Sequence, residues 1–158
     1  MAKFIIIRGK KDSGKTTTAG LVFIELLKIS ELKHLVNGKD VVSNSLEYNS
    51  DTGDLKDFSA ILTINSKKIA IISAGDEVNP LANNINDFIA NNINIIICCA
   101  RSRNVKGSTY RMIIDTYTKD HQILKEIWVY YSIDKEDKDV IKKASVFEIF
   151  EIVNKYVK

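Results

Sequence analysis

No other stretch of the chain limits its fold as strongly as eight residues near the N-terminus, which read Gly9-Lys10-Lys11-Asp12-Ser13-Gly14-Lys15-Thr16. A β-branched apolar run at residues 3–8 precedes them, and a helical pattern follows them. Glycines let the backbone curl so that successive N–H groups point at one anion, and the helix that follows adds the positive end of its dipole. The spacing therefore predicts a strand, an anion-binding loop and a helix in immediate succession.

The segment matches the pattern G-x-x-x-x-G-K-[ST] at every specified position, and there the chain resembles the P-loop NTPase superfamily. The resemblance is strong over about residues 3–35. It implies that Lys15 reaches the β and γ phosphates of a nucleoside triphosphate and that the Thr16 hydroxyl ligates Mg²⁺. The nucleotide-binding residues that it implies are Gly9, Lys10, Lys11, Asp12, Ser13, Gly14, Lys15, Thr16 and Thr17.

One lysine of this loop has a more specific resemblance. Lys10 directly follows the first glycine, as the signature lysine does in partition ATPases, whose loop begins Lys-Gly-Gly. Lys11 and Asp12 take the place of those two glycines, which allow a second subunit to pack closely. We therefore prefer to interpret Lys10 and Lys11 as solvated loop lysines, and a homodimer or another protein partner stays open as an alternative.

The rest of the chain alternates between patterns typical of strands and of helices. We expect a helix at residues 15–36 that ends at Asn37-Gly38, and an exposed loop at residues 44–57. A charged loop is expected at residues 134–139, before a last helix that opens at Ser145 with Glu148 as its capping partner. The other expected helices lie at residues 80–91 and 109–121, and the other expected strands at residues 39–43, 58–64, 68–73, 93–100 and 126–132.

These elements predict an α/β fold in one domain, residues 1–158. The apolar run at residues 93–100 is typical of a central parallel strand that is covered on both faces. Residues 65–67 separate two β-rich runs and indicate one hairpin. Together with the resemblance, this gives an expected three-layer P-loop NTPase fold, in which a mostly parallel sheet with one β-hairpin is flanked by helices.

A carboxylate is needed near Thr16 if Mg²⁺ is to bind there. The usual place is directly after an apolar strand, but Ser73 follows the strand Ile69–Ile72, and the first carboxylate is Asp76. Gly75 allows the chain to turn back toward the metal. We therefore assign Asp76 to Mg²⁺ or to positioning a water molecule, with helix capping as the alternative and Glu77 as a lesser candidate.

Three of the four arginines, Arg101, Arg103 and Arg111, fall within eleven residues just after the run at 93–100. Ligands of open parallel sheets bind beyond the carboxyl ends of the strands, and arginine recognises phosphate in a bidentate manner. We assign Arg101 and Arg103 to the transferred group or to an acceptor phosphate, the alternative being a basic loop without a ligand. Arg111 lies inside the predicted helix and is expected to be a surface or salt-bridging residue.

Composition narrows the possible partners and compartment. A net charge of +3 is too small to indicate nucleic acid, and no apolar stretch approaches the roughly 18 residues of a membrane span. The four-residue apolar run Phe4–Ile7 is too short for the core of a signal peptide. Cys98 and Cys99 lie in an apolar run, where buried thiols are expected, and this favours a cytoplasmic location.

Three functions remain open for a Mg²⁺-dependent, ATP-binding chain. The first is a kinase that transfers a phosphoryl group to a nucleotide or small metabolite, which the arginine cluster favours. The second is a partner-regulated ATPase or GTPase-like switch, because residues 44–57 and 73–77 follow the loop in the order of the two switch loops of small GTPases. No Asn-Lys-x-Asp motif is present, so ATP is favoured over GTP. The third is a non-catalytic nucleotide-binding subunit.

Overall fold

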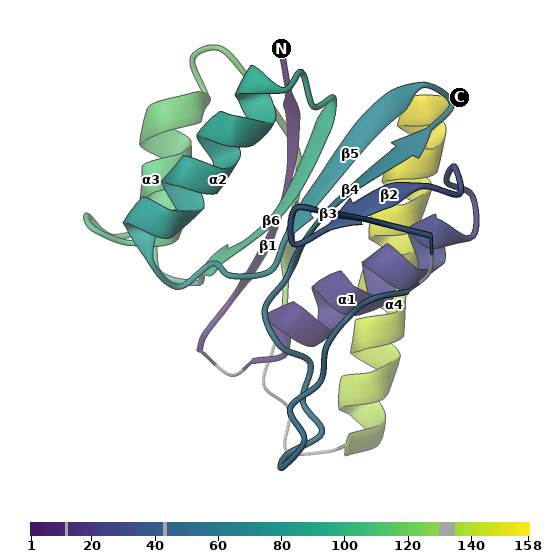
Figure 1. The fold of residues 1–158 in the computed structure, drawn as a ribbon. Coiled ribbons are helices and arrows are strands. Elements are labelled where there is room, and N and C mark those ends of the chain that lie inside the picture. Colours follow the sequence, from purple (N-terminus) through teal and green to yellow (C-terminus); the bar gives the residue numbers. More distant parts are fainter. Residues whose placement is uncertain (12, 43, 130–134) are drawn as a thin grey trace.

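The structure is a computed structural model that describes residues 1–11, 13–42, 44–129 and 135–158. Within these residues the chain forms seven strands and four helices (Figure 1). In chain order they are β1 (Lys3–Gly9), α1 (Lys15–Leu27), β2 (His34–Val36), β3 (Lys39–Val41), β4 (Ser59–Ile64), β5 (Lys67–Ile72), α2 (Val78–Ala90), β6 (Ile95–Arg101), α3 (Thr109–Tyr117), β7 (Gln122–Trp128) and α4 (Lys135–Val157).

All seven strands belong to one mixed sheet with the order β3-β2-β4-β5-β6-β1-β7. Strands β5, β6, β1 and β7 pair in parallel, whereas β2, β3 and β4 join the sheet through antiparallel pairings. The prediction of an α/β fold is thus confirmed. The sheet is half antiparallel rather than mostly parallel, and it has two hairpins, β2-β3 and β4-β5, where one was predicted.

Helices cover both faces of the sheet (Figure 1). Helices α2 and α3 lie on one face, and α1 and α4 lie on the other. The packing of β1 explains the unbroken apolar run at residues 4–7: Phe4 and Ile6 join the core under α2 and α3, whereas Ile5 and Ile7 join the core under α1 and α4. A strand that is buried on both faces takes apolar side chains at its central positions, and Arg8 near its end is buried only because it has an ion pair with Glu126 and a hydrogen bond to the Ser102 carbonyl oxygen.

The central position predicted for residues 93–100 is confirmed, because β6 lies between β5 and β1 and pairs in parallel with both. Its two cysteines are fully buried on opposite faces of the sheet. Burial raises the pKa of the Cys98 thiol to about 12 and also raises the pKa of the Cys99 thiol. Both thiols are therefore protonated packing groups, as predicted.

The first helix is shorter than predicted, because α1 ends at Leu27 and His34–Val36 form a strand. Asn37 and Gly38 have φ values of 50° and 77°, so they form the tight turn of the β2-β3 hairpin and do not end a helix. Strand β2 pairs with β4, and this pairing replaces the last turns of the predicted helix. Ile29 and Leu32, which follow the end of α1, are exposed.

The C-terminal part also differs from the prediction. Helix α4 begins at Lys135, so Ser145 lies inside it and does not cap it, and residues 135–139 are helical rather than a loop. Asp134 and residues 130–132 of the predicted strand lie outside the described residues. Strand β7 covers Gln122–Trp128 and is an edge strand with mostly half-exposed or exposed residues, not a buried one. An edge strand needs only one apolar face, and this explains its mixed sequence.

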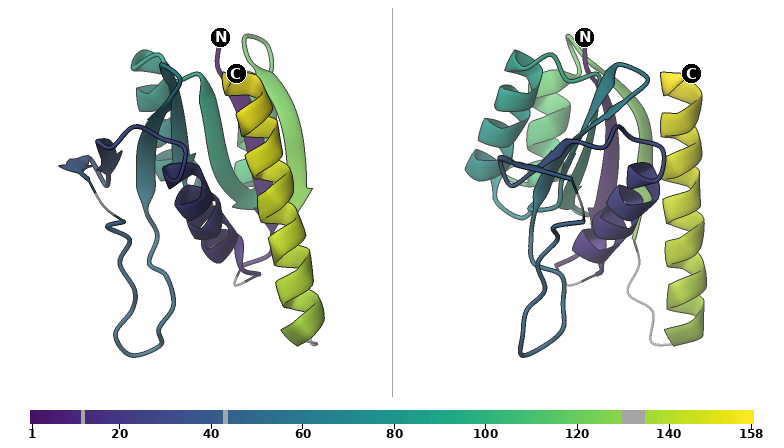
Figure 2. Two further views of the ribbon diagram at one scale, coloured as in Figure 1. Left: turned by 90° about the vertical axis from the view of Figure 1, so that its right-hand side faces the viewer. Right: turned by 45° about the vertical axis from the view of Figure 1, so that its right-hand side comes forward.

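The other predicted elements are confirmed with small changes at their ends. Helices α2 and α3 and strands β3, β4 and β5 lie where the sequence placed them. Residues 44–57 contain only one isolated bridge, Tyr48 to Leu55, and they extend away from the sheet as a long loop (Figure 2). This loop returns to the sheet at Asp57, just before β4 begins.

Candidate functional site

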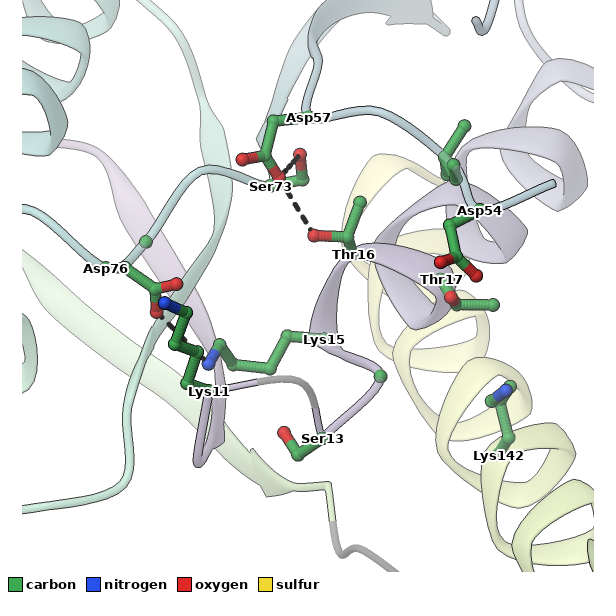
Figure 3. A pocket seen from close by; sticks show the side chains of 13 residues that line it. Lys11, Ser13, Lys15, Thr16, Thr17, Asp54, Asp57, Ser73, Asp76 and Lys142 are labelled. Carbon is green, nitrogen blue, oxygen red and sulfur yellow. Dashed lines mark hydrogen bonds and ion pairs between the residues drawn. The ribbon is translucent and has the colours of Figure 1, made fainter. Parts of the chain in front are cut away.

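Several segments meet at the edge of the sheet where β1, β5 and β6 end. Because these strands are parallel, the residues that follow each of them lie at the same edge. A pocket of about 470 Å³ opens there, between the loop after β1, residues 54–57 and residues 73–76 (Figure 3). Six of the predicted nucleotide-binding residues line it, namely Lys11, Ser13, Gly14, Lys15, Thr16 and Thr17.

The loop after β1 is built around close contacts. A Cβ atom on Gly9 would lie 2.2 Å from Ser13 Oγ and 3.0 Å from the Val129 carbonyl oxygen, so any other residue here would force Ser13 and the neighbouring backbone to shift. Gly14 has a φ of 95° at the start of α1, which also favours glycine. Ser13 Oγ is buried and has no hydrogen-bond partner among the described residues. Asp12, the remaining predicted residue of this loop, lies outside the described residues.

Lys15 is buried, and its ammonium group faces the loop. Its Nζ donates to the carbonyl oxygens of Gly9 at 2.9 Å and Lys10 at 3.0 Å. A carboxylate oxygen of Asp76 lies 3.4 Å from the same nitrogen (Figure 3). The cation is thus held inside the curl of the loop, at the mouth of the pocket, where it can meet an anion.

Asp76 lies between two cations. Its Oδ1 is 3.4 Å from Lys15 Nζ and 3.3 Å from Arg101 Nε, so the structure brings together three of the residues predicted to be catalytic. Strand β6 separates β5 from β1, yet Asp76 reaches the loop because Gly75 passes over the end of β6. A Cβ atom on Gly75 would lie 2.0 Å from the Cys99 carbonyl oxygen, so only glycine permits this path.

The carboxylate bonded to Thr16 is Asp57, which the sequence analysis did not assign to the site. Thr16 Oγ1 donates to Asp57 Oδ1 at 2.9 Å, and Ser73 Oγ donates to the same oxygen at 3.2 Å (Figure 3). Ser73 also accepts the backbone N–H of Phe58 at 2.8 Å, which fixes its hydroxyl. The metal role predicted for Asp76 therefore has a second candidate, which lies closer to Thr16.

Asp57 precedes a strand, whereas a metal-binding carboxylate was expected only beyond the carboxyl end of a strand. Strand β4 is antiparallel to β5, so its amino end lies at the edge of the sheet where β5 ends. The sequence does hold a signal for the position of Asp57. Asp57 directly precedes the apolar run at residues 58–64, and the predicted hairpin turns the start of that run toward the site.

The three clustered arginines have different surroundings. Arg101 is partly exposed and pairs with Asp76. Arg103 is exposed and lines a second hollow beside the first. Arg111 pairs with Asp115 at 2.7 Å on the surface of α3, which confirms its prediction as a salt-bridging residue.

The donor set fits Mg²⁺ that is bound together with a phosphate chain. No group of three or more acidic, histidine or cysteine side chains within the described residues could hold a metal by itself. Protein-bound Mg²⁺ commonly takes one or two carboxylates, water molecules and the phosphates of its substrate. Thr16 and Asp57 could supply the protein oxygens, and the unpartnered Ser13 hydroxyl and the Lys15 ammonium could meet the phosphates.

No model of a protein family, no curated protein and no solved structure matches this chain. No helix in the described part of the chain is long and apolar enough to cross a membrane. The chain's own residues must therefore support any assignment of function.

Proposed function

We propose that this chain is a P-loop protein that binds a Mg²⁺–nucleoside triphosphate and transfers the terminal phosphoryl group to a small acceptor. The observation that supports this most directly is the pair of neighbouring contacts at the start of α1. Lys15 Nζ is held by the carbonyl oxygens of Gly9 and Lys10, and the Thr16 hydroxyl meets the carboxylate of Asp57. A buried ammonium next to a hydroxyl–carboxylate pair suits a phosphate chain and its metal.

In this proposal each residue has a definite task. The backbone N–H groups of the loop and the Ser13 hydroxyl hold phosphate oxygens, and Lys15 neutralises charge on the terminal two phosphates. Thr16 and Asp57 hold the metal, which when bound neutralises charge that develops on the phosphates. Arg101 stabilises the group in transit, and Asp76 keeps Lys15 and Arg101 oriented toward each other.

Transfer to an acceptor is favoured over hydrolysis because a second hollow directly adjoins the first. Lys11 and Asp76 line both hollows, so an acceptor in the second would lie next to a phosphate in the first. ATP is the preferred nucleotide, because the sequence contains no guanine-recognition motif.

A nucleotide-dependent switch is the second candidate function, and one contact favours it. Asp57 ends the long loop of residues 44–57 and is bonded to Thr16, so a metal bound at Thr16 would act directly on that loop. A partner protein that binds only one position of this loop would then bind in a nucleotide-dependent manner. A non-catalytic nucleotide-binding subunit uses the same contacts without turnover.

The first test is thermal unfolding with and without Mg²⁺–ATP, in the unaltered protein and in Lys15→Ala. We expect ATP to raise the melting temperature of the unaltered protein and to leave that of Lys15→Ala unchanged, because the variant lacks the buried cation. Lys39→Ala, at an exposed position of β3, is the matched control and should keep the full shift. An equal shift in Lys15→Ala would disprove the site. Thr16→Val provides a second variant if Lys15→Ala does not fold.

Incubation with ATP labelled at the γ phosphate then separates the two candidate functions. Label on a molecule from a pool of nucleotides and small metabolites supports transfer. Label released only as inorganic phosphate, at the same slow rate with or without the pool, contradicts transfer and supports the switch.

A further inference from the structure

A second hollow of about 600 Å³ lies between the loop after β1 and the segment that joins β6 to α3. It shares Lys11 and Asp76 with the first pocket, so the two hollows adjoin, with these two residues at their border. A molecule in the second hollow would therefore lie beside any group that the first pocket presents to Asp76 and Arg101.

The second hollow is strongly basic. Within the described residues the only acidic one in its lining is Asp76, which already pairs with Lys15 and Arg101. Arg103 and Lys106 are exposed, and neither has an ion-pair or hydrogen-bond partner among the described residues. Its basic lining residues are Lys10, Lys11, Arg101, Arg103 and Lys106. Five cations against one carboxylate in the described lining favour a ligand that carries more than one negative charge.

The segment that carries these cations is held in place at several points. Thr109 is buried, and its Oγ1 accepts the backbone N–H of Arg101 at 2.8 Å. Arg8 donates to the Ser102 carbonyl oxygen at 2.7 Å. A turn bonds Ser108 N–H to the Val105 carbonyl oxygen at 3.0 Å. Because both ends of the segment are fixed, its basic side chains start from a set backbone geometry when they meet an anion.

The lining also indicates which kind of anion fits. Among the described residues no aromatic side chain lines the hollow, and Val105 is the one large apolar residue in that lining. The described lining offers a nucleobase no ring on which to stack, whereas a phosphate monoester with hydroxyl groups matches its arginines and lysines and also Ser102 and Ser108. We propose that this hollow is the acceptor site and that it takes a small, hydroxyl-bearing phosphate monoester and not a nucleoside.

The reaction at this site rests on the proposed function. A hydroxyl oxygen of the acceptor bonds to the γ phosphorus of ATP, and the bond from that phosphorus to the β–γ bridging oxygen breaks. ADP leaves with the electrons of the broken bond, and the acceptor proton passes to the Asp76 carboxylate and then to water. The products are ADP and a bisphosphorylated acceptor, so all atoms and charges are accounted for.

The test monitors the backbone amide signals of the full chain by NMR while a ligand is added at constant ionic strength. The added ligands are inorganic phosphate, glycerol 3-phosphate, glycerol and adenosine. We expect the two phosphates to shift the amides of residues 101–109, and glycerol and adenosine to leave them unchanged. The double variant Arg103→Gln, Lys106→Gln should weaken this binding about tenfold or more, because two charge-assisted contacts are lost. Lys39→Gln with Lys119→Gln removes the same charge elsewhere and should have no effect.

Lys15→Ala separates this proposal from the nucleotide site. The shifts at residues 101–109 should persist in that variant, whereas any response to ATP should disappear. Two results would overturn the acceptor site and leave the nucleotide site standing. In the first, phosphate shifts only the amides of residues 9–17. In the second, the double variant retains the full shifts at residues 101–109. Binding of adenosine in preference to glycerol 3-phosphate would overturn the ligand class.

Discussion

The guanidinium carbon of Arg8 lies 3.4 Å from the centre of the Tyr110 ring, and the Arg8 side chain is only 7% exposed. The Trp128 ring lies 4.1 Å from the same carbon, and Glu126 pairs with the guanidinium at 3.2 Å. Arg8 also holds the carbonyl oxygen of Ser102, the residue between Arg101 and Arg103. One buried cation of β1 therefore links α3, β7 and the segment that carries the arginines of the site.

We expect Arg8→Lys to lower the free energy of unfolding by about 2 kcal/mol, because lysine keeps the charge but loses the planar stacking and the forked hydrogen bonds. Urea titration followed by circular dichroism measures this change. Arg111→Lys is the matched control on α3, where the surface pair with Asp115 contributes about 0.5 kcal/mol or less. If the free energies of unfolding of Arg8→Lys and Arg111→Lys differed by less than about 0.5 kcal/mol, the linking role of Arg8 would be contradicted.

Asp57→Asn tests the assignment of the metal ligand. The amide keeps an oxygen for the Thr16 hydroxyl but loses the negative charge that favours Mg²⁺. We expect the thermal shift produced by ATP to become nearly independent of Mg²⁺, while the melting temperature without nucleotide changes by only a few degrees. Differential scanning fluorimetry across a Mg²⁺ series gives both quantities.

Two other variants make the Asp57 result specific. Asp51→Asn removes a carboxylate from an exposed position of the same loop and should leave the Mg²⁺ dependence unchanged. Asp76→Asn removes the carboxylate that pairs with Lys15 and should weaken ATP binding at every Mg²⁺ concentration. If Asp76→Asn alone abolished the Mg²⁺ dependence, the metal would belong to Asp76, as the sequence predicted.

Local signals in the sequence were sufficient for the strand–loop–helix unit around Lys15 and for the buried strand β6. The glycine spacing and the uninterrupted apolar run each depend on neighbours in the chain, and the order strand, loop, helix and the central strand are both confirmed, whereas anion binding by the loop stays a prediction. The prediction of a helix ending at Asn37-Gly38 was wrong because the same pair suits both a helix end and a tight hairpin turn. Only the pairing of β2 with β4 decides between the two. The place of Asp57 in the site was not predicted for a similar reason, because it depends on the direction of β4 within the sheet.

Gly75→Ala tests how Asp76 reaches the site. The added methyl group would lie 2.0 Å from the Cys99 carbonyl oxygen, and the backbone of a central strand cannot move away cheaply. We expect a loss of several kcal/mol in unfolding free energy, or displacement of residues 73–76 with loss of ATP binding. Gly20→Ala is the control, because its methyl group would clash with the flexible end of the Leu55 side chain, at 2.3 Å, and make an ordinary contact with Leu46 Cδ1 at 3.7 Å. Equal effects of the two substitutions in urea titration would show that residues 73–76 do not depend on this close approach.

The buried thiol of Cys98 predicts how stability changes in alkali. Burial raises its pKa to about 12, whereas a cysteine in an unfolded chain ionises near ~8.5. Above that pH the unfolded chain loses a proton that the folded chain retains, so the free energy of unfolding falls as pH rises toward 12, by up to about 1.4 kcal/mol per pH unit. Below pH 8 the thiol is protonated in both states, so its contribution to the free energy of unfolding does not change with pH. In urea titrations between pH 8 and 11, the free energy of unfolding should therefore fall less steeply with pH for Cys98→Ala than for the unaltered protein. This holds whatever the difference in unfolding free energy between the two proteins at pH 8. Equal slopes would mean that the thiol ionises as easily in the folded chain as in the unfolded one, which a fully buried position on β6 does not allow.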